Sequence, residues 1–363
     1  MSNLEEQWKF GFLLPNISIS RAVGNEYIVL THINDPKVQV LLQKQRSLQY
    51  LIKGFSDQYK RQVAPSIIII REEQLRTKSG IVAVIDFRNI LAICCIVTTW
   101  KNFLNRGQHI PASAGFSDYF DIYPILPHKF DEYLITLSPA VHGLDFAKDF
   151  SGQTKPEIVG QVHDPRYEPI MFQALINQWE DQYINRKSSN WRRTALFRSL
   201  QIVYQACAMP ISNYETIYDY GSSLALWVSS FEILAHPQIG QVQKSNVLSL
   251  ITDKPLQSKE LTNRLYTISL GRNNCRVNLP QKLYSQIYDS RNNFLHGEPV
   301  KRKHLFPWGK TRRYPLHFFI PLIYNLALIS HLCISDLYAK EYYEQRLIEQ
   351  ALLKSTINLP KNP

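Results

Sequence analysis

The chain has 363 residues, 45% of them hydrophobic and 12% aromatic, which is enough apolar material for a buried core and excludes a protein that is disordered overall. Its length favours two domains over one. Lys and Arg number 41 against 30 Asp and Glu, and the formal charge of +11 favours a polyanionic partner, although composition does not separate RNA, DNA and an anionic membrane surface.

The first 155 residues are predicted to form a mixed α/β domain. β-Branched runs bounded by turn-forming residues indicate strands, and apolar residues at helical spacing indicate helices. The expected strands are Glu26–His32, Ser66–Arg71 and Tyr133–Leu137, and the expected helices are Val38–Phe55 and Ile90–Leu104. Residues 106–127 are rich in Pro, Gly and Asp and show little periodicity. The polar segment Gly152–Pro165 contains two prolines, so we place the domain boundary there.

Residues 164–350 have the longer apolar periods of helices, joined by short connections. The expected helices are Tyr167–Arg186, Trp191–Ala208, Glu215–Ala235, Lys259–Ser269, Pro280–His296 and Leu316–Ile348. Six such helices predict an all-α bundle whose core is built from facing apolar stripes. The predicted fold class of the whole chain is therefore α+β, with a mixed α/β domain followed by a helical bundle.

The most membrane-like stretch is His317–Ile334, which is about long enough to span a bilayer. Pro321, Asn325 and two histidines interrupt it, so we expect a buried helix and no membrane partner. The first ten residues include acids and no apolar run, and the five cysteines have no metal-ligand spacing, as is typical of the reducing cytoplasm. We therefore expect a cytoplasmic protein without a metal or cofactor.

The segment Pro280–Lys303 contains the most unusual placement of polar residues. Its helix is expected to end near Gly297, because glycine favours the left-handed conformation of helix ends. Along that helix, Arg291, Asn292 and His296 occupy rows in which the apolar pattern predicts buried or contact-forming residues. Such residues need partners, since an unpaired buried charge is unstable. These three side chains are therefore the candidate site.

Residues 291–296, Arg-Asn-Asn-Phe-Leu-His, are similar to the signature of the HEPN superfamily, in which four to six residues separate an arginine from a histidine. Gly297 follows the histidine, as in many members related to the ApeA-like HEPN group. Residues 225–237 resemble the second core helix of that family, in which an acidic residue such as Glu232 often supports the site. Spacing alone is not specific, because Arg312 and His317 have the same separation. The resemblance covers about half of the chain.

The resemblance implies a metal-independent endoribonuclease, such as a toxin or an antiviral effector, that acts as a homodimer. Two protomers of that family usually join their motifs into one composite site with two arginines and two histidines. The residue types suit this chemistry. His296 can move protons to and from the reacting oxygens, and Arg291 can stabilise negative charge on phosphorus. Asn292 could orient the imidazole or bind a phosphate oxygen. The expected products are a 2′,3′-cyclic phosphate and a 5′-hydroxyl.

A stretch of 13 residues directly after the motif, 301–313, contains six cations and no acid. The cations are Lys301, Arg302, Lys303, Lys310, Arg312 and Arg313, with Phe306 and Trp308 among them. Clustered cations neutralise phosphates, and an exposed aromatic ring can stack on an unpaired base, so we predict RNA binding here with Trp308 as the stacking ring. The alternative is a solvated loop whose Trp308 fills a gap in the bundle.

Other chemistries have little support in the sequence. It contains no Gly-rich phosphate loop ending in Lys-Ser/Thr, no His-Glu-x-x-His and no Cys-x-x-Cys. Asp86, Asp118 and Asp121 have no histidine or lysine partner at a useful spacing. Three hypotheses follow. In the first, the chain is a HEPN endoribonuclease whose amino-terminal domain senses a trigger, restrains the nuclease or binds a regulatory protein. In the second, it is a non-catalytic HEPN module that binds RNA or protein. In the third, it is a scaffold whose helical domain only dimerises.

Overall fold

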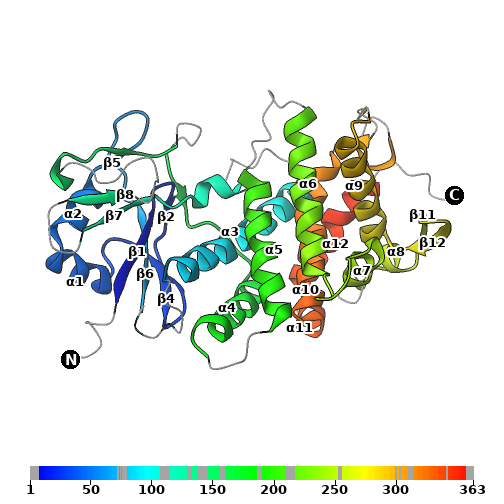
Figure 1. Ribbon diagram of the computed structural model, residues 1–363, viewed down its shortest axis with the longest axis horizontal. Helices are drawn as coiled ribbons and strands as arrows, with labels where there is room; N and C mark the ends of the chain where they lie inside the picture. The colour runs from blue at the N-terminus through cyan, green and yellow to red at the C-terminus, as the bar shows by residue number, and fades with distance from the viewer. Residues whose placement is uncertain are drawn as a thin grey trace. The chain divides into compact units, whose positions relative to one another are not determined.

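A computed structural model describes residues 8–71, 73, 75, 80–106, 115–128, 133–136, 146–155, 160–185, 190–208, 217–251, 256–298, 301, 304–309, 314–340 and 342–356. The chain divides into two compact units, the first made of residues 1–90, 117–166 and 176–187, and the second of residues 91–116, 167–175 and 188–363. The first unit carries a sheet and the second is mainly helical, so the fold class is α+β (Figure 1).

The two units differ from the two continuous segments expected from the sequence, 1–155 and 164–350. The difference arises at two helices, α3 (Gly80–Arg106) and α4 (Pro169–Tyr183), because each contributes residues to both units. A boundary drawn from composition cannot detect a helix that continues from one unit into the other.

The first unit is built on a four-stranded antiparallel sheet. The strand order is β1 (Lys9–Leu14), β6 (Ser66–Ile70), β4 (Ile28–Thr31) and β3 (Val23–Gly24), so the strands expected at 26–32 and 66–71 are confirmed. The other strands of this unit form three short pairs. These are β2 (Ile17–Ser18) with β10 (Val162–His163), β5 (Phe55–Ser56) with β9 (Gly152–Gln153), and β7 (Ile125–Pro127) with β8 (Leu134–Thr136).

Two helices pack their apolar residues against this sheet. They are α1 (Pro36–Lys44) and α2 (Arg46–Lys53), and the core they share with the strands includes Leu13, Val29, Leu48, Phe55 and Ile67. The sequence predicted one helix, Val38–Phe55, and this is wrong at Gln45. That residue is extended, and its side chain donates to the carbonyl of His128 at 2.9 Å, which interrupts the helix.

The second unit contains most of the helices. They are α5 (Trp191–Ala208), α6 (Ile217–Leu234), α7 (Lys244–Leu250), α8 (Lys259–Thr262), α9 (Leu279–Leu295), α10 (Ile320–His331), α11 (Ser335–Lys340) and α12 (Tyr342–Leu353). Short 3-10 turns lie at Ser117–Phe120, Ala147–Asp149, Pro307–Gly309, Leu316–Phe319 and Lys354–Thr356. The helices expected at 167–186, 191–208, 215–235 and 280–296 are confirmed, each to within a few residues at its ends.

The helix expected at Lys259–Ser269 is wrong, so the second unit is not all-α. Only α8 is helical there, and it is followed by an antiparallel hairpin of β11 (Tyr266–Leu270) and β12 (Asn273–Val277). Gly271 lies in the two-residue turn with a φ of 63°, a left-handed conformation that glycine adopts without strain. The alternation of β11 between buried and exposed residues is that of a strand rather than of a helix.

The single helix expected at Leu316–Ile348 is also wrong, because α10 ends at His331. Cys333 adopts a left-handed φ of 58°, its N–H donates to the Ser330 carbonyl, and the Ile334 N–H donates to the Ile329 carbonyl. These two bonds form the Schellman ending that usually carries a glycine. No glycine marks the position in the sequence, so the break was not predicted.

Helix α10 is buried at every position except Ser330, as expected for the stretch His317–Ile334. Among the residues that the structure describes, the one helix long and apolar enough to cross a membrane is instead α3. In its most apolar window, 83% of the residues are buried inside the protein.

Candidate functional site

The carboxyl end of α9 carries the predicted motif and is closed by backbone hydrogen bonds. Gly297 has a φ of 72°, and its N–H donates to the Phe294 carbonyl at 3.1 Å. The Glu298 N–H donates to the Asn293 carbonyl at 2.9 Å, which completes a Schellman motif. The helix therefore ends at Leu295 with His296 as its C-cap residue, directly before Gly297 as predicted.

Helix α6 lies beside α9 in the second unit and runs antiparallel to it (Figure 1). The rings of Phe231 and Tyr284 pack with their centroids 5.0 Å apart. Ten residues away on each helix, Gly221 lies against Phe294 so closely that a Cβ on Gly221 would be 2.1 Å from the ring. The absence of a side chain at Gly221 therefore lets Phe294, which lies inside the motif, pack on α6.

Arg291 is held by partners from both helices. Its Nη2 donates to Oε2 of Glu232 on α6 at 3.1 Å, and its Nη1 donates to Oδ1 of Asn292 at 2.9 Å. The guanidinium carbon also lies 5.5 Å from the ring centroid of Tyr288. The side chains of Arg291 and Glu232 are 18% and 22% exposed, so the pair is neither free in solvent nor sealed from it. Two of the five guanidinium N–H donors are engaged, which leaves donors for a ligand.

The surroundings of this ion pair perturb the acids near it. Burial raises the pKa of Glu232, and the charge of Arg291 acts in the opposite direction. The neighbouring Tyr284 is fully buried, and burial, with the charge of Glu232, raises the pKa of its hydroxyl well above the usual value. Tyr284 is therefore a core residue rather than an acid or base of the site.

His296 is exposed on the last turn of α9, and its backbone N–H donates to the Asn292 carbonyl at 2.9 Å. The side chain of Asn292 bonds to Arg291. Of the two roles expected for this asparagine, orienting the imidazole or binding phosphate, neither is the contact observed. The structure thus brings Arg291, Asn292 and Glu232 together, with His296 presented to solvent at the adjacent helix end.

Most of the predicted basic segment lies outside the described residues. This applies to Arg302, Lys303, Lys310, Arg312 and Arg313. Lys301 is described and exposed, and its backbone N–H donates to Nδ1 of His304 at 3.3 Å. The His304 carbonyl in turn accepts from the hydroxyl of Ser290 on α9 at 2.9 Å. This bond attaches the start of the basic segment to the helix that carries the motif.

Trp308, the predicted stacking residue, makes contacts within the protein. Its Nε1 donates to the Ser355 carbonyl at 2.9 Å, and its ring packs on Tyr266 with centroids 5.1 Å apart. The side chain is only partly exposed. These contacts favour the alternative interpretation, in which Trp308 fills a gap in the bundle.

The second arginine–histidine pair differs in setting from the first. His317 is surrounded by the rings of Phe318, Tyr220 and Trp100, with centroids 4.4, 5.2 and 6.5 Å away. Removal from water lowers the pKa of His317 to about 3, so it stays neutral at physiological pH. Its setting is that of a core residue, and its partner in spacing, Arg312, lies outside the described residues.

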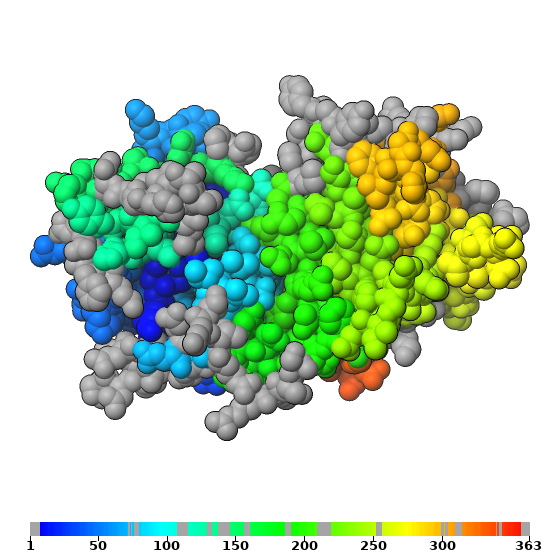
Figure 2. Space-filling view, in the orientation of Figure 1, coloured from blue at the N-terminus to red at the C-terminus, as the bar shows by residue number. Residues whose placement is uncertain are grey.

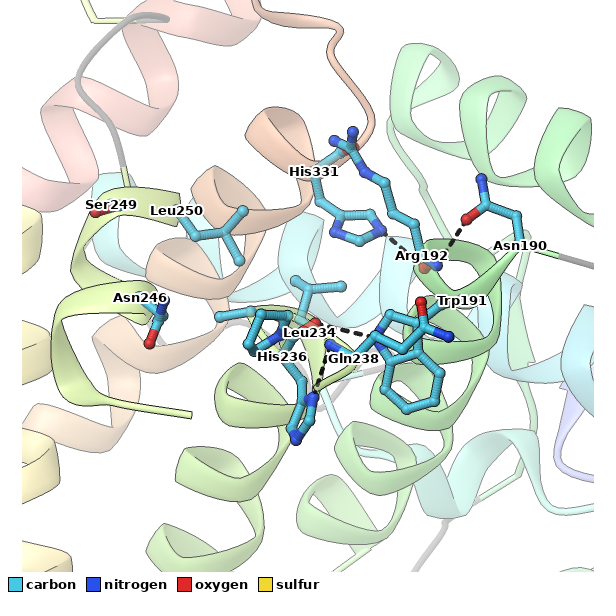
Figure 3. Close-up of a pocket in the computed structure, with 12 residues that line it drawn as sticks. Asn190, Trp191, Arg192, Leu234, His236, Gln238, Asn246, Ser249, Leu250 and His331 are labelled. Atoms are coloured by element: carbon cyan, nitrogen blue, oxygen red, sulfur yellow. Dashed lines mark hydrogen bonds between the residues drawn. The ribbon is translucent and has the colours of Figure 1, made fainter. Parts of the chain in front are cut away.

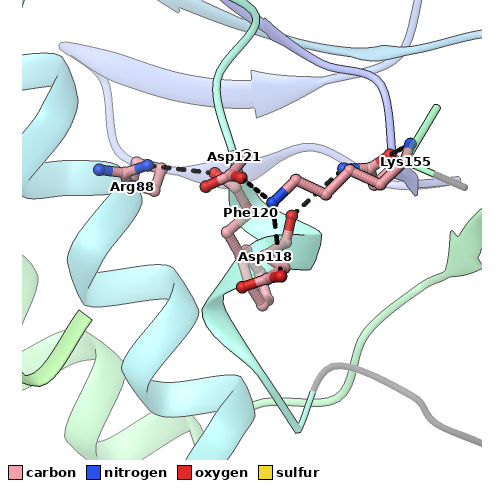
Figure 4. Close-up of polar contacts among 6 residues, drawn as sticks. Arg88, Asp118, Phe120, Asp121 and Lys155 are labelled. Atoms are coloured by element: carbon pink, nitrogen blue, oxygen red, sulfur yellow. Dashed lines mark hydrogen bonds and ion pairs between the residues drawn. The ribbon is translucent and has the colours of Figure 1, made fainter. Parts of the chain in front are cut away.

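Asp118 and Asp121 have no histidine or lysine partner at a useful spacing in the sequence, but the fold places Lys155 beside both of them. Nζ of Lys155 lies 3.4 Å from Oδ2 of Asp118 and 2.5 Å from Oδ2 of Asp121 (Figure 4). Asn16 accepts from the Lys155 backbone and donates to the Asp118 carbonyl. The lysine lies more than thirty residues downstream, so only the fold unites the three charges. Within the described residues, no group of three or more His, Cys, Asp or Glu is arranged to hold a metal ion.

A cavity of about 470 Å³ in the second unit lies where α6 ends and α5 begins (Figure 3). Trp191 donates through Nε1 to the His236 carbonyl at 3.0 Å, and His331 Nε2 lies 3.1 Å from the Arg192 carbonyl. Burial, with a contribution from Arg192, lowers the pKa of His331 to about 4. No carboxylate is among the residues that line the cavity, and its two histidines are His236 and His331.

The positive charge of the chain is concentrated in one part of the sequence. Residues 188–363 contain 21 Lys and Arg against 11 Asp and Glu, which is an excess of +10 out of the total of +11. The motif therefore lies in the half of the chain with almost all of the net charge. Comparisons found no match to a protein-family model, to a curated protein or to a solved structure.

Proposed function

We propose that the second unit is a HEPN-type domain and that the protein is a metal-independent endoribonuclease. The observation that carries the proposal is the setting of Arg291. Its guanidinium is fixed by Glu232 and Asn292 one to two turns before α9 ends at an exposed histidine, His296. A fixed cation and a solvent-accessible imidazole near the same helix end are groups that RNA cleavage without a metal can use.

RNA supplies its own nucleophile. The 2′-hydroxyl attacks the adjacent phosphorus, the bond from phosphorus to the 5′ oxygen breaks, and the products are a 2′,3′-cyclic phosphate and a 5′-hydroxyl. A neutral imidazole of His296 takes the proton of the 2′-hydroxyl, and a protonated one gives a proton to the leaving oxygen. Arg291 stabilises the charge that builds on the phosphate oxygens, through the N–H donors that Glu232 and Asn292 leave available.

One chain provides one Arg291 and one His296, whereas acid and base act in the same step. We propose that a homodimer supplies the second histidine, so that one imidazole is the base and the other is the acid. The exposure of His296, and of Leu295 at 54%, is consistent with a motif that a second protomer covers. The first unit would then regulate this site by sensing a trigger or binding a regulatory protein.

A second function, RNA or protein binding without catalysis, is favoured by one specific observation. The ion pair with Glu232 neutralises Arg291, and Nε of the guanidinium is buried without a hydrogen-bond partner. An arginine held in this way resembles a structural residue. Catalysis therefore has to be tested directly rather than inferred from the presence of the two side chains.

The test is cleavage of a labelled single-stranded RNA in excess EDTA by the native protein and by Arg291→Ala and His296→Ala. Matched controls are Arg198→Ala and His163→Ala, which remove the same side chains at exposed positions outside the motif. We expect the native protein and both controls to cut the RNA, and both motif variants to lose at least about a hundredfold in rate. Cleavage that EDTA abolishes, or that survives both motif substitutions, would refute the proposal. Binding without cleavage would favour the second function.

A further inference from the structure

The hairpin of β11 and β12 has one face packed on the second unit and one face open. Tyr266, Ile268, Cys275 and Val277 point inward and are buried or partly buried. The outer face of the hairpin consists of Thr267, Ser269, Asn274 and Arg276, all exposed, and Arg272 is exposed in the turn. Figure 2 shows the hairpin (yellow) at the surface of this unit near α9 (orange). The outer face thus presents hydroxyl, amide and guanidinium groups, with no apolar side chain among them.

The outer face of the hairpin carries arginines and no acid, while the charge of the flanking Glu260 acts on Tyr266 of the inner face. The segment Leu261–Tyr288 contains no Asp or Glu, and its four cations are Arg264, Arg272, Arg276 and Lys282. A protein partner would need apolar anchors, which the outer face lacks. A phosphate backbone instead needs cations together with hydroxyl and amide groups. The composition of the surface therefore favours a nucleic acid over a protein.

Helix α9 extends from the hairpin to the motif, and it has contacts with each of them. Nζ of Lys282, near the start of α9, donates to the Thr267 carbonyl of the hairpin at 3.0 Å. Further along α9, the centroid of the Tyr288 ring lies 4.8 Å from Nζ of Lys244 and 5.5 Å from the guanidinium carbon of Arg291. At a rise of about 1.5 Å per residue, Lys282 lies about 21 Å from His296 along the helix. A bound strand of a few nucleotides would span this distance.

We propose that the outer face of the hairpin, with Arg272 and Arg276, binds the phosphate backbone of the RNA whose cleavage is assigned to Arg291 and His296. This inference rests on the proposed function for the identity of the ligand. The hairpin supplies affinity and sets where the strand lies, while the motif supplies the chemistry. Neither arginine of the hairpin takes part in the reaction.

The test measures binding of a fluorescent 2′-O-methyl RNA, which lacks the nucleophile and is not cleaved, by anisotropy at several salt concentrations. Each cation that neutralises a phosphate of a single strand contributes about 0.7 to the slope of log K against log salt. Arg272→Ala/Arg276→Ala should therefore lower the slope by about 1.4 and lower affinity about 25-fold at 0.1 M salt. With cleavable RNA the same variant should raise KM and leave kcat unchanged.

The matched control is Lys44→Ala/Lys53→Ala, which removes two exposed cations from α1 and α2 of the first unit. It should leave the slope unchanged. An unchanged slope for the hairpin variant, or an equal fall for both variants, would overturn the inference, even if the native protein cuts RNA. A lower slope in a protein that does not cut RNA would instead support the hairpin and refute the proposed function. If the native protein binds no RNA, both fail.

Discussion

Replacing Gly221 with alanine tests how the motif is held against α6. A Cβ at position 221 would lie 2.1 Å from Cδ2 and 2.3 Å from Cγ of Phe294. Non-bonded carbon atoms touch at about 3.5–4.0 Å, so the ring would have to move by about 1.4–1.9 Å. Because Cγ is the base of the ring, rotation of the ring about the Cβ–Cγ bond cannot relieve the overlap, so either Phe294 adopts another χ1 rotamer or α9 shifts.

Two effects of opposite sign decide the stability of Gly221→Ala. Overpacking of this size costs about 1–3 kcal/mol, whereas alanine inside a helix is favoured over glycine by about 1 kcal/mol. We therefore expect the free energy of unfolding to fall by up to about 2 kcal/mol. RNA cleavage should fall as well, because Phe294 lies between Arg291 and His296 and its displacement moves both.

Urea denaturation of four proteins, the native chain, Gly221→Ala, Phe294→Ala and the double variant, separates the two effects. Once Phe294 is alanine the overlap is gone, and Gly221→Ala should then raise the free energy of unfolding by up to about 1 kcal/mol. The substitution thus changes sign between the two backgrounds. If Gly221→Ala were equally stabilising in both, the close packing of α6 on α9 would be refuted.

Substitutions at three further residues test individual side chains. Glu232→Ala should lower the free energy of unfolding, measured in urea, by about 1–3 kcal/mol, because Arg291 loses its carboxylate partner. Glu232→Gln should lower it by less, because the amide oxygen still accepts a hydrogen bond from Arg291. Equal losses for the two variants would contradict this. Burial raises the pKa of Asp86 from 3.8 to about 6, so its protonated form stabilises the fold. Relative to Asp86→Asn, the native protein should lose about 3 kcal/mol as pH rises from 3 to 7, measured by denaturation at each pH, and a constant difference would exclude the shift. Trp308→Phe should lower the free energy of unfolding by about 1 kcal/mol, because the hydrogen bond to the Ser355 carbonyl is lost. RNA affinity, measured by anisotropy, should not change. A large loss of affinity would instead support stacking of Trp308 on RNA.

The parts of the fold that were predictable are those whose signals are local. Helix α9 is an example, since Asn278 and Gln281 form a capping box at its start and Gly297 stops it. Helix α5 has apolar residues at helical spacing throughout, and its bounds were predicted without error. The end of α10 before Cys333 was missed because the residue in the left-handed conformation there is a cysteine and not a glycine. Strand β1 was also missed, since its identity as a strand depends on pairing with β6 more than fifty residues away.

The candidate site was predictable only in part. The sequence singled out Arg291, Asn292 and His296 as polar residues on a helix that should bury its faces, and the resemblance added Glu232. The contact of Arg291 with Glu232 depends on how closely α6 and α9 approach, and Gly221, a residue without any polar or charged signal, permits that approach. The grouping of Asp118 with Lys155 was beyond reach for the same reason, because it depends on the fold rather than on spacing.

The ion pair at the motif has a consequence for how the proposed enzyme would bind RNA. Glu232 cancels the charge of Arg291, so the motif itself attracts phosphate weakly at long range. Residues 188–363 nevertheless have an excess of +10, and eight of their cations belong to the hairpin and to the basic segment after α9 rather than to the motif. Affinity and chemistry would then be carried by separate residues. Substitutions on the hairpin should change KM and the salt dependence, whereas substitutions at Arg291 and His296 should change kcat.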